Sequence, residues 1–213
     1  MEKGLSDLSP DELGRLFPIR VVEFDEKWEG YFRKERSHLL TILGTALAVR
    51  IIHFGSTAVP GLAAKPTIDI LVEIPKEMAN RLDPKIIKEN AEEHEIRDAI
   101  TRRMEEHGYI RMKDHPTHLM FVKGYNETGY DDTCYHIHMG SIEEDQLWDR
   151  LYFMDFLIRN PDTAREYGEL KRDLARRFFN DREAYTAAKT DFIRNVTEKA
   201  KWEIETGIRA ESL

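Results

Sequence analysis

The sequence contains a single cysteine, Cys134, so it cannot form an internal disulfide. No apolar run approaches the ~18 residues that a membrane span needs, and the N-terminal residues lack the apolar core of a signal peptide. Glycine and proline are also scarce, at 12 and 8 residues, and no stretch rich in them forms a linker. We therefore expect a cytoplasmic protein that does not associate with membranes.

Basic residues are also fewer than acidic ones. The 32 lysines and arginines are outnumbered by 40 acidic residues, which gives a net charge of −8. A general nucleic-acid binder needs a basic surface for phosphate contacts, so this class is not expected. The 41% of hydrophobic residues in 213 positions is enough for a sizeable core without a metal or disulfide staple.

Hydrophobic periodicity predicts a mixed α/β (α+β) fold, with helices flanking a β-sheet and a helical C-terminal segment. We expect a single domain over 1–213, with an α/β core at about 20–140 and a helical tail at about 143–204 packed on it. The expected strands are 20–24, 50–54, 67–74, 109–112, 118–123 and 133–139, with a loop at 124–132. The expected helices are 25–47, one or two exposed helices within 76–107, and then 143–159, 162–179 and 182–204.

A small-residue loop after the strand at 50–54 carries the sharpest local pattern. Gly55 lets the backbone approach a ligand, and Ser56 and Thr57 follow with hydroxyl and amide donors for phosphate oxygens. Asp69, on the next strand, is suited to hold a divalent cation against those phosphates, and Lys65 adds a positive charge. A tight turn followed by a solvated aspartate explains the same residues without a ligand.

The run HFGSTAVPGLAAKPTIDILV at 53–72 is similar to the signature of the GrpB-like family, in the polymerase-β-like nucleotidyltransferase superfamily. The runs at 21–28, 135–139 and 161–189 resemble further family motifs in the same order. The resemblance implies a nucleotidyltransferase-like fold. It also implies metal-dependent transfer of a nucleotidyl or phosphoryl group from a nucleoside triphosphate to a small acceptor, with magnesium or manganese as the metal.

The superfamily places two carboxylates two residues apart on the strand that here carries Asp69. Such side chains share one face about 6–7 Å apart and can share metal ions. In this chain the second position is Leu71, and the next acid on that face, Glu73, lies roughly 13 Å away by strand rise. The usual two-carboxylate metal site is therefore absent.

Two histidines on a later strand are candidates for the missing ligands. His136 and His138 are two residues apart, so both rings face one side of the strand. The resemblance puts that strand beside the one that carries Asp69. We therefore expect a catalytic and metal-binding cluster of Asp69, His136 and His138, joined in one variant by His53. Imidazoles suit zinc, manganese or iron better than magnesium, and they also serve as phosphate donors or general bases. The alternative is two polar residues on an outer edge.

The helical tail repeats one arrangement twice. Tyr167 and Lys171 are four residues apart, as are Tyr185 and Lys189, so each phenol lies beside an ammonium. These pairs suit a nucleotide, with lysine on phosphate and tyrosine stacked on base or sugar. Ordinary amphipathic packing, with lysine stems over apolar surface, explains the same spacing.

Three functions follow from these observations. The first is a nucleotidyltransferase acting on a nucleotide and a small-molecule acceptor. The second is a non-catalytic module for a nucleotide or a coenzyme-A-type ligand with a degenerate metal site, because the resemblance includes domains fused to dephospho-coenzyme A kinase. The third is a metal-dependent phosphohydrolase built on the histidines. The oligomeric state is not predicted.

Overall fold

The computed structural model describes residues 8–76, 91–112, 118–143 and 145–208. The strands are β1 (Arg50–Phe54), β2 (Thr67–Glu73), β3 (Ile110–Met112), β4 (Leu119–Asn126) and β5 (Gly129–Gly140). The helices are α1 (Pro10–Leu16), α2 (Lys27–Leu43), α4 (Ala91–Glu105), α5 (Asp145–Arg159), α6 (Pro161–Arg177), α7 (Arg182–Ala187) and α8 (Thr190–Glu205), with a short 3-10 helix, η2 (Ser56–Ala58).

The strands form one mixed sheet in the order β1-β2-β5-β4-β3. Strands β2 and β5 are parallel, and the other neighbours are antiparallel. The register places Asp69 opposite Phe54 on β1 and opposite His136 on β5. Because paired residues point to the same face, the sheet alone brings these side chains together.

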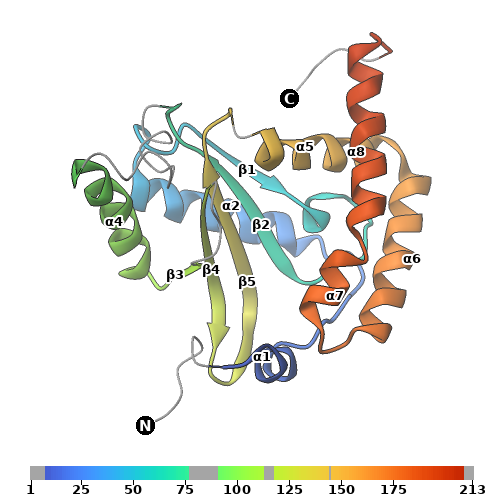
Figure 1. Ribbon diagram of the computed structural model, residues 1–213, viewed down its shortest axis with the longest axis horizontal. Helices are drawn as coiled ribbons and strands as arrows, with labels where there is room; N and C mark the ends of the chain where they lie inside the picture. The colour runs from blue at the N-terminus through green and yellow to red at the C-terminus, as the bar shows by residue number, and fades with distance from the viewer. Residues whose placement is uncertain (1–7, 77–90, 113–117, 144, 209–213) are drawn as a thin grey trace.

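The two faces of the sheet have different covers (Figure 1). Helices α2 and α4 pack on one face, where Leu39 and Met104 join strand residues such as Ile70 in the largest apolar cluster. Helix α5 covers part of the other face, where Leu71 packs beneath Trp148. The remaining helices α6, α7 and α8 lie on the α5 side in Figure 1. Asp69 shares the α5 face with Leu71, because residues two apart on a strand point the same way.

The mixed α/β fold predicted from the sequence is confirmed, including the sheet, its flanking helices and the helical C-terminal segment. Ser9 and Glu12 form a reciprocal capping box at the start of α1. Among the described residues, no helix is both long enough and apolar enough to cross a membrane.

Several predicted boundaries are wrong. The segment 20–24 is not a strand, because only Val22 finds a partner, in an isolated bridge to Ala64. The loop expected at 124–132 is a tight hairpin in which β4 continues to Asn126 and β5 begins at Gly129. The helix expected at 182–204 is broken by a turn between α7 and α8.

The charged segment 76–107 differs from expectation in one respect. The part at 77–90, with Ile86 and Ile87, lies outside the described residues. Helix α4 is present, but Ile100 and Met104 are buried in the core, so its C-terminal half is not an exposed helix. Apolar residues four apart on a charged helix indicate such a buried stripe, and here the stripe packs on the sheet.

Candidate functional site

The turn at Gly55 connects β1 to η2 and lies against the side chain of Asp69. Gly55 has a φ of 73° and a ψ of −168°, a conformation that L side chains rarely adopt. A Cβ atom on Gly55 would lie 2.5 Å from Oδ2 of Asp69. The turn thus brings backbone against the carboxylate, and only glycine permits both the conformation and the close approach.

We predict that Gly55→Ala destabilises the protein by about 2–4 kcal/mol, because it adds a clash to a backbone cost of roughly 1–2 kcal/mol. Gly61→Ala is the matched control, since Gly61 has a φ of 75° and open space around its Cβ position. Gly61→Ala should therefore lower the folding stability only by the backbone cost of about 1–2 kcal/mol. Chemical denaturation of both variants measures the difference, and equal costs would show that Asp69 moves away freely.

Asp69 and His136 form a pair across adjacent strands, at the place where the sequence predicted two ligands of a metal cluster. Nδ1 of His136 lies 3.2 Å from Oδ1 of Asp69, and the two side chains are 16% and 27% exposed. The other ring nitrogen, Nε2, is 2.7 Å from the hydroxyl of Tyr125, whose ring stacks on the imidazole. The chain Asp69–His136–Tyr125 orients the imidazole at both nitrogens.

The electrostatic surroundings favour an ionised Asp69. Burial by itself raises the pKa of this carboxyl group, but the hydrogen bond and charge of His136 act in the opposite direction. Lys65 and Arg150 add to the lowering, and the net pKa lies below its ordinary value. Asp69 therefore carries its negative charge at neutral pH.

Ser56 is the meeting point of the loop and the helical tail. Nζ of Lys171, on α6, donates a hydrogen bond of 2.8 Å to Oγ of Ser56, although the two residues are 115 positions apart. Lys171 is only 2% exposed. Lys65 and Lys189 both lie over the Tyr185 ring, with Nζ at 5.9 and 4.1 Å, and their charges act on Lys171, so the three predicted lysines form one cluster beside Ser56.

The two predicted tyrosines form the floor of this cluster. Nζ of Lys171 lies 4.5 Å above the Tyr167 ring, and Nζ of Lys189 lies 4.1 Å above the Tyr185 ring. The lysine–tyrosine contacts expected from the four-residue spacing are therefore present. Both rings are buried, at 3% and 1% exposure, and Tyr167 also stacks on Phe192. Neither phenol ring is placed to stack on a base, so the tyrosines support the ammonium groups instead.

The lysines share an unfavourable electrostatic environment. Burial, then the charges of Lys189 and Arg172, lower the pKa of Lys171 to about 6. Burial also lowers the pKa of Lys65 and of Lys189 to about 8, with repulsion from Arg182 acting on both. Asp69 is the carboxylate that acts on all three lysines in the favourable direction. The cluster therefore lacks negative charge, and a bound anion would supply it.

Thr57 and His53 support the loop rather than the site. The hydroxyl of Thr57 donates to the backbone carbonyl of Thr67 at 3.2 Å, and Nε2 of His53 lies 3.0 Å from the same hydroxyl. His53 stacks on Phe32 of α2, on the face of the sheet opposite to Asp69. The variant in which His53 joins the Asp69 cluster is thus wrong, because alternation along β1 turns its ring away.

His138 lies on the same face as His136 but one step further along β5, opposite Leu71. Its Nδ1 is 3.0 Å from Nε2 of His118. Arg150, on α5, places Nη1 at 3.3 Å from each ring nitrogen of His138 and lies over the Phe54 ring. His138 is therefore engaged by these two partners rather than by Asp69.

These donors do not fit a resident metal ion. Leu71 is completely buried, Glu73 pairs with Arg50 at 2.9 Å, and both ring nitrogens of His136 are already engaged. In the part of the chain that the structure describes, no three histidine, cysteine or acidic side chains are grouped to hold a metal. The expected Asp69/His136/His138 metal cluster is not assembled, and a hydrolase built on it has no support.

Sequence reasoning did not single out Tyr125, Arg150 or Arg182. Arg182 donates to the hydroxyl of Tyr130 at 3.1 Å and lies over the Tyr125 ring, beside the lysine cluster. The three residues come from β4, α5 and α7, and none belongs to a local motif.

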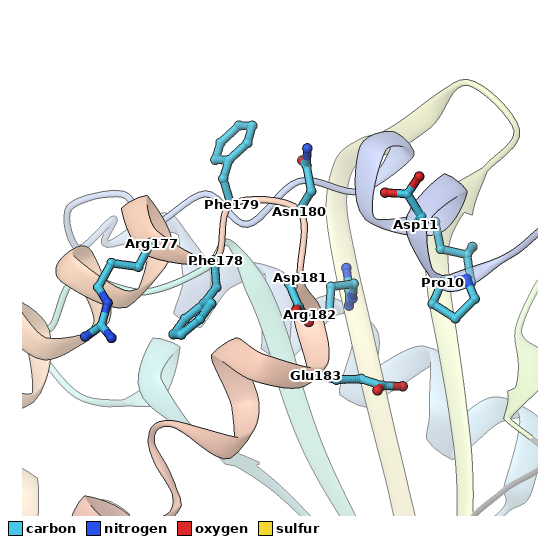
Figure 2. A pocket seen from close by; sticks show the side chains of 10 residues that line it. Pro10, Asp11, Arg177, Phe178, Phe179, Asn180, Asp181, Arg182 and Glu183 are labelled. Atoms are coloured by element: carbon cyan, nitrogen blue, oxygen red, sulfur yellow. The ribbon is translucent and has the colours of Figure 1, made fainter.

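A hollow of about 620 Å³ lies apart from this site, between α1 and the turn from α6 to α7 (Figure 2). Its lining includes Asp11, Phe179 and Asn180. Arg182 belongs to that lining and also donates a hydrogen bond to the hydroxyl of Tyr130. We therefore locate the candidate function by its chemistry, at Ser56, Asp69 and the lysines, and not by the volume of this hollow.

Comparisons with known proteins identify the family of this chain. The family described as GrpB protein matches residues 18–199, which include every candidate site residue. The UPF0157 protein PA4798 of Pseudomonas aeruginosa is 34% identical over 184 residues, which cover 85% of this chain and 67% of that protein. A dephospho-CoA kinase of Mycolicibacterium paratuberculosis is 27% identical over 209 residues, or 94% of this chain and 50% of the kinase.

A solved structure shows the same fold. The crystal structure of the conserved protein GrpB from Enterococcus faecalis superposes with a TM-score of 0.68 and 27% identity, covering 85% of this chain and 96% of that one. The chain spans about half to two thirds of the length of the two sequence relatives. Since the family match extends over most of the sequence, the chain belongs to the GrpB family.

Proposed function

We propose that the protein binds the phosphates of a nucleoside triphosphate at Ser56 and the lysine cluster, and transfers a nucleotidyl or phosphoryl group to a small acceptor. One observation carries the proposal. Three lysines from the loop and the tail converge beside an ionised Asp69 that is paired with His136. A packing role alone does not explain why one buried and two half-buried cations gather where they repel one another.

The charge balance supports an anionic ligand. Lys65, Lys171 and Lys189 have no ion-pair partner among the described residues, and burial together with neighbouring positive charges lowers their pKa values to about 8, 6 and 8. A triphosphate brings roughly four negative charges into surroundings where charge–charge interactions are strong. Binding of the nucleotide thus offsets a cost that the free protein bears.

In this proposal Ser56, Lys171 and Lys189 hold the outer phosphates, and Lys65 lies nearer to Asp69. The backbone amides of the glycine turn add neutral donors, as in other loops that bind phosphate. As the bond to the leaving pyrophosphate breaks, negative charge grows on its oxygen. Preorganised ammonium groups stabilise that charge, and this is a major source of rate enhancement in phosphoryl transfer.

His136 acts as the general base. The acceptor hydroxyl attacks the α-phosphorus, an oxygen–phosphorus bond forms, pyrophosphate leaves, and the hydroxyl proton passes to Nε2 of His136. Asp69 keeps the proton of the free imidazole on Nδ1 and stabilises the imidazolium. In the free protein Nε2 accepts a hydrogen bond from Tyr125, so this nitrogen already accommodates a hydroxyl donor. The acceptor hydroxyl takes that position or passes its proton through the phenol.

Magnesium enters this scheme as part of the substrate. Mg²⁺ is commonly held by one or two carboxylates together with substrate phosphates and water. With Asp69 as the single carboxylate at the site, the triphosphate itself would supply most of the ligands. Manganese would behave similarly, and zinc would find no set of free imidazoles among the histidines that the structure describes at this site.

The alternative is a module that binds a nucleotide or a coenzyme-A-type ligand without chemistry. The buried Leu71 at the position of the second carboxylate favours it, as does the similarity to a dephospho-CoA kinase. The two proposals share the phosphate site and differ only in turnover. A ligand that binds at Ser56 and is never converted would support the module.

The test of the phosphate site is a proton count. At pH 8 Lys171 is almost fully deprotonated in the free protein, and Lys65 and Lys189 are each about half protonated. A bound triphosphate raises all three pKa values, so binding should take up as many as about two protons. At pH 5.5 all three lysines are largely protonated, and the uptake should become small.

Calorimetric titration with ATP in buffers of different ionisation enthalpy measures this uptake. Lys171→Arg is the matched variant, because a guanidinium keeps its proton and should remove about one proton of the uptake at pH 8. Binding that is independent of pH and buffer would contradict the proposal, as would a net release of protons.

A further inference from the structure

Arg150 is a half-buried cation without a carboxylate partner at the edge of the site. Among the described residues, no acidic side chain lies within ion-pair distance of its guanidinium. Its neighbours are the Phe54 ring, at 5.8 Å, and His138, at 3.3 Å. Arginines in this position normally face an acid, as Arg159 does with Asp155 at 3.0 Å on the same helix. Asp69 is the carboxylate whose charge acts on Arg150, but among the described residues no acid pairs with the guanidinium directly.

The strand register separates Arg150 from the lysine cluster. Strand β1 runs opposite to β2, so the chain leaves Phe54, the partner of Asp69, and continues through Ser56 toward the start of β2. Lys65 also precedes β2. Arg150 instead lies over Phe54 and His138, and His138 pairs with Leu71, beyond Asp69. Along β2 the order is thus lysine cluster, then Asp69, then Arg150, with steps of about 6–7 Å between residues on one face.

This order gives each end of the site its own cation. If the triphosphate occupies the lysine cluster and Asp69 marks the point of transfer, then the acceptor lies on the other side of Asp69. We propose that Arg150 forms an acceptor subsite, and that the acceptor is a small hydroxyl compound with an anionic group, either a phosphate monoester or a carboxylate. This inference rests on the proposed function for the role of the first subsite.

The neighbours of Arg150 suit this role. The Phe54 ring and the His138 imidazole fix the plane of the guanidinium, while His118 holds His138 from behind at 3.0 Å. A guanidinium fixed in this way presents its remaining N–H groups as a fork, which matches two oxygens of a phosphate or carboxylate. The subsite therefore discriminates for anionic acceptors over neutral polyols.

The experiment separates the two subsites with two variants. The protein is first saturated with α,β-methylene ATP, which fills the lysine cluster without transfer, and is then titrated with glycerol 3-phosphate or with glycerate. We expect at least one of these probes to bind. Arg150→Met should weaken that binding at least about 10-fold, the typical effect of one lost charge-assisted hydrogen bond. It should change the affinity for α,β-methylene ATP by less than about 3-fold.

Arg50→Met is the matched control. Arg50 lies on the same face of the sheet and stacks on Trp148 at 4.9 Å, but it is paired with Glu73. Its removal should lower the melting temperature without changing the affinity for either probe. Arg150→Met should leave the melting temperature unchanged or raise it, because it removes an unpaired, half-buried charge. A merely structural Arg150 would give the opposite pattern.

Three results would overturn the subsite. They are binding of neither probe to the saturated protein, probe binding that Arg150→Met does not weaken, and a loss of α,β-methylene ATP affinity in Arg150→Met as large as in Lys171→Met. Absence of α,β-methylene ATP binding to the wild type would instead refute the proposed function. In that case the probes are titrated against the free protein. Weaker probe binding in Arg150→Met would then support an anion subsite, and unchanged probe binding would overturn it.

Discussion

Replacing Lys171 by methionine is expected to weaken ATP binding by about 10- to 100-fold, equivalent to one charge-assisted hydrogen bond of roughly 1.5–3 kcal/mol. Lys171 is the most deeply buried lysine of the cluster, and its ammonium is held by Ser56 and the Tyr167 ring. Methionine has a similar length and fills the same space without the charge. Isothermal titration calorimetry at pH 7 measures the loss.

The same variant should be at least as stable as the wild type. The pKa of Lys171 is lowered to about 6 from 10.5, so folding disfavours its charged form. Between pH 6 and pH 10.5 the unfolded chain therefore binds a proton at Lys171 that the folded chain does not bind. The free energy of unfolding of the wild type thus rises with pH across that window. Below pH 6 Lys171 is charged in both states, and the folded protein bears the full free-energy cost of burying that charge. Lys171→Met removes it, and the gain in melting temperature should be larger at pH 6 than at pH 10.

Lys201→Met provides the control. Lys201 also lies over a tyrosine ring, that of Tyr152 at 5.6 Å, and it pairs with Asp149 at 2.6 Å away from the site. It should leave ATP affinity unchanged. A Lys171→Met variant that binds ATP as well as the wild type would show that the lysine cluster does not hold the phosphates.

Asp69→Asn is expected to reduce turnover by about 1000-fold or more, because it removes the charge that orients His136 and stabilises its protonated form. Asparagine keeps the shape of the side chain. ATP affinity should remain the same or improve, since a carboxylate repels phosphate. The measurement is the release of pyrophosphate from ATP, with glycerol 3-phosphate, glycerate or water as acceptor, next to calorimetric titration with and without magnesium.

Asp149→Asn, at the paired surface position on α5, should leave turnover unchanged. Two outcomes would contradict the proposed role of Asp69. Retained turnover in Asp69→Asn would remove Asp69 from the chemistry. A magnesium-dependent loss of ATP affinity, without a loss of turnover at saturating ATP, would mean that Asp69 acts only by holding the metal and does not orient His136.

Much of the fold follows from the sequence because the strands are strongly patterned. The run at 67–74 is apolar except at Thr67, Asp69 and Glu73, and β2 is indeed an internal strand with a neighbour on each side. The segment 20–24 shows the limit of such reasoning. Its residues have β propensity, but a strand needs a partner along its length, and here Ala64 supplies a single bridge. Propensity does not specify which neighbours the fold provides.

The site was predictable where its residues belong to contiguous motifs. Gly55, Ser56 and Asp69 come from one loop and its strand, and the register of β5 follows once His136 is assigned to a neighbouring strand. The partners of His138 were not predictable. His118 reaches it from the residue before β4 and Arg150 reaches it from α5, and these contacts depend on tertiary packing rather than on any local spacing. The metal cluster failed for the same reason, because other partners had already engaged the imidazoles.

The most direct test of the phosphate site is a crystal structure of the protein with α,β-methylene ATP. Our account predicts phosphate oxygens within hydrogen-bond distance, about 2.7–3.2 Å, of Oγ of Ser56 and Nζ of Lys171, with the α-phosphate on the Asp69 side of the lysine cluster. A nucleotide bound in the hollow between α1 and the α6–α7 turn, with the lysine cluster unchanged, would contradict it.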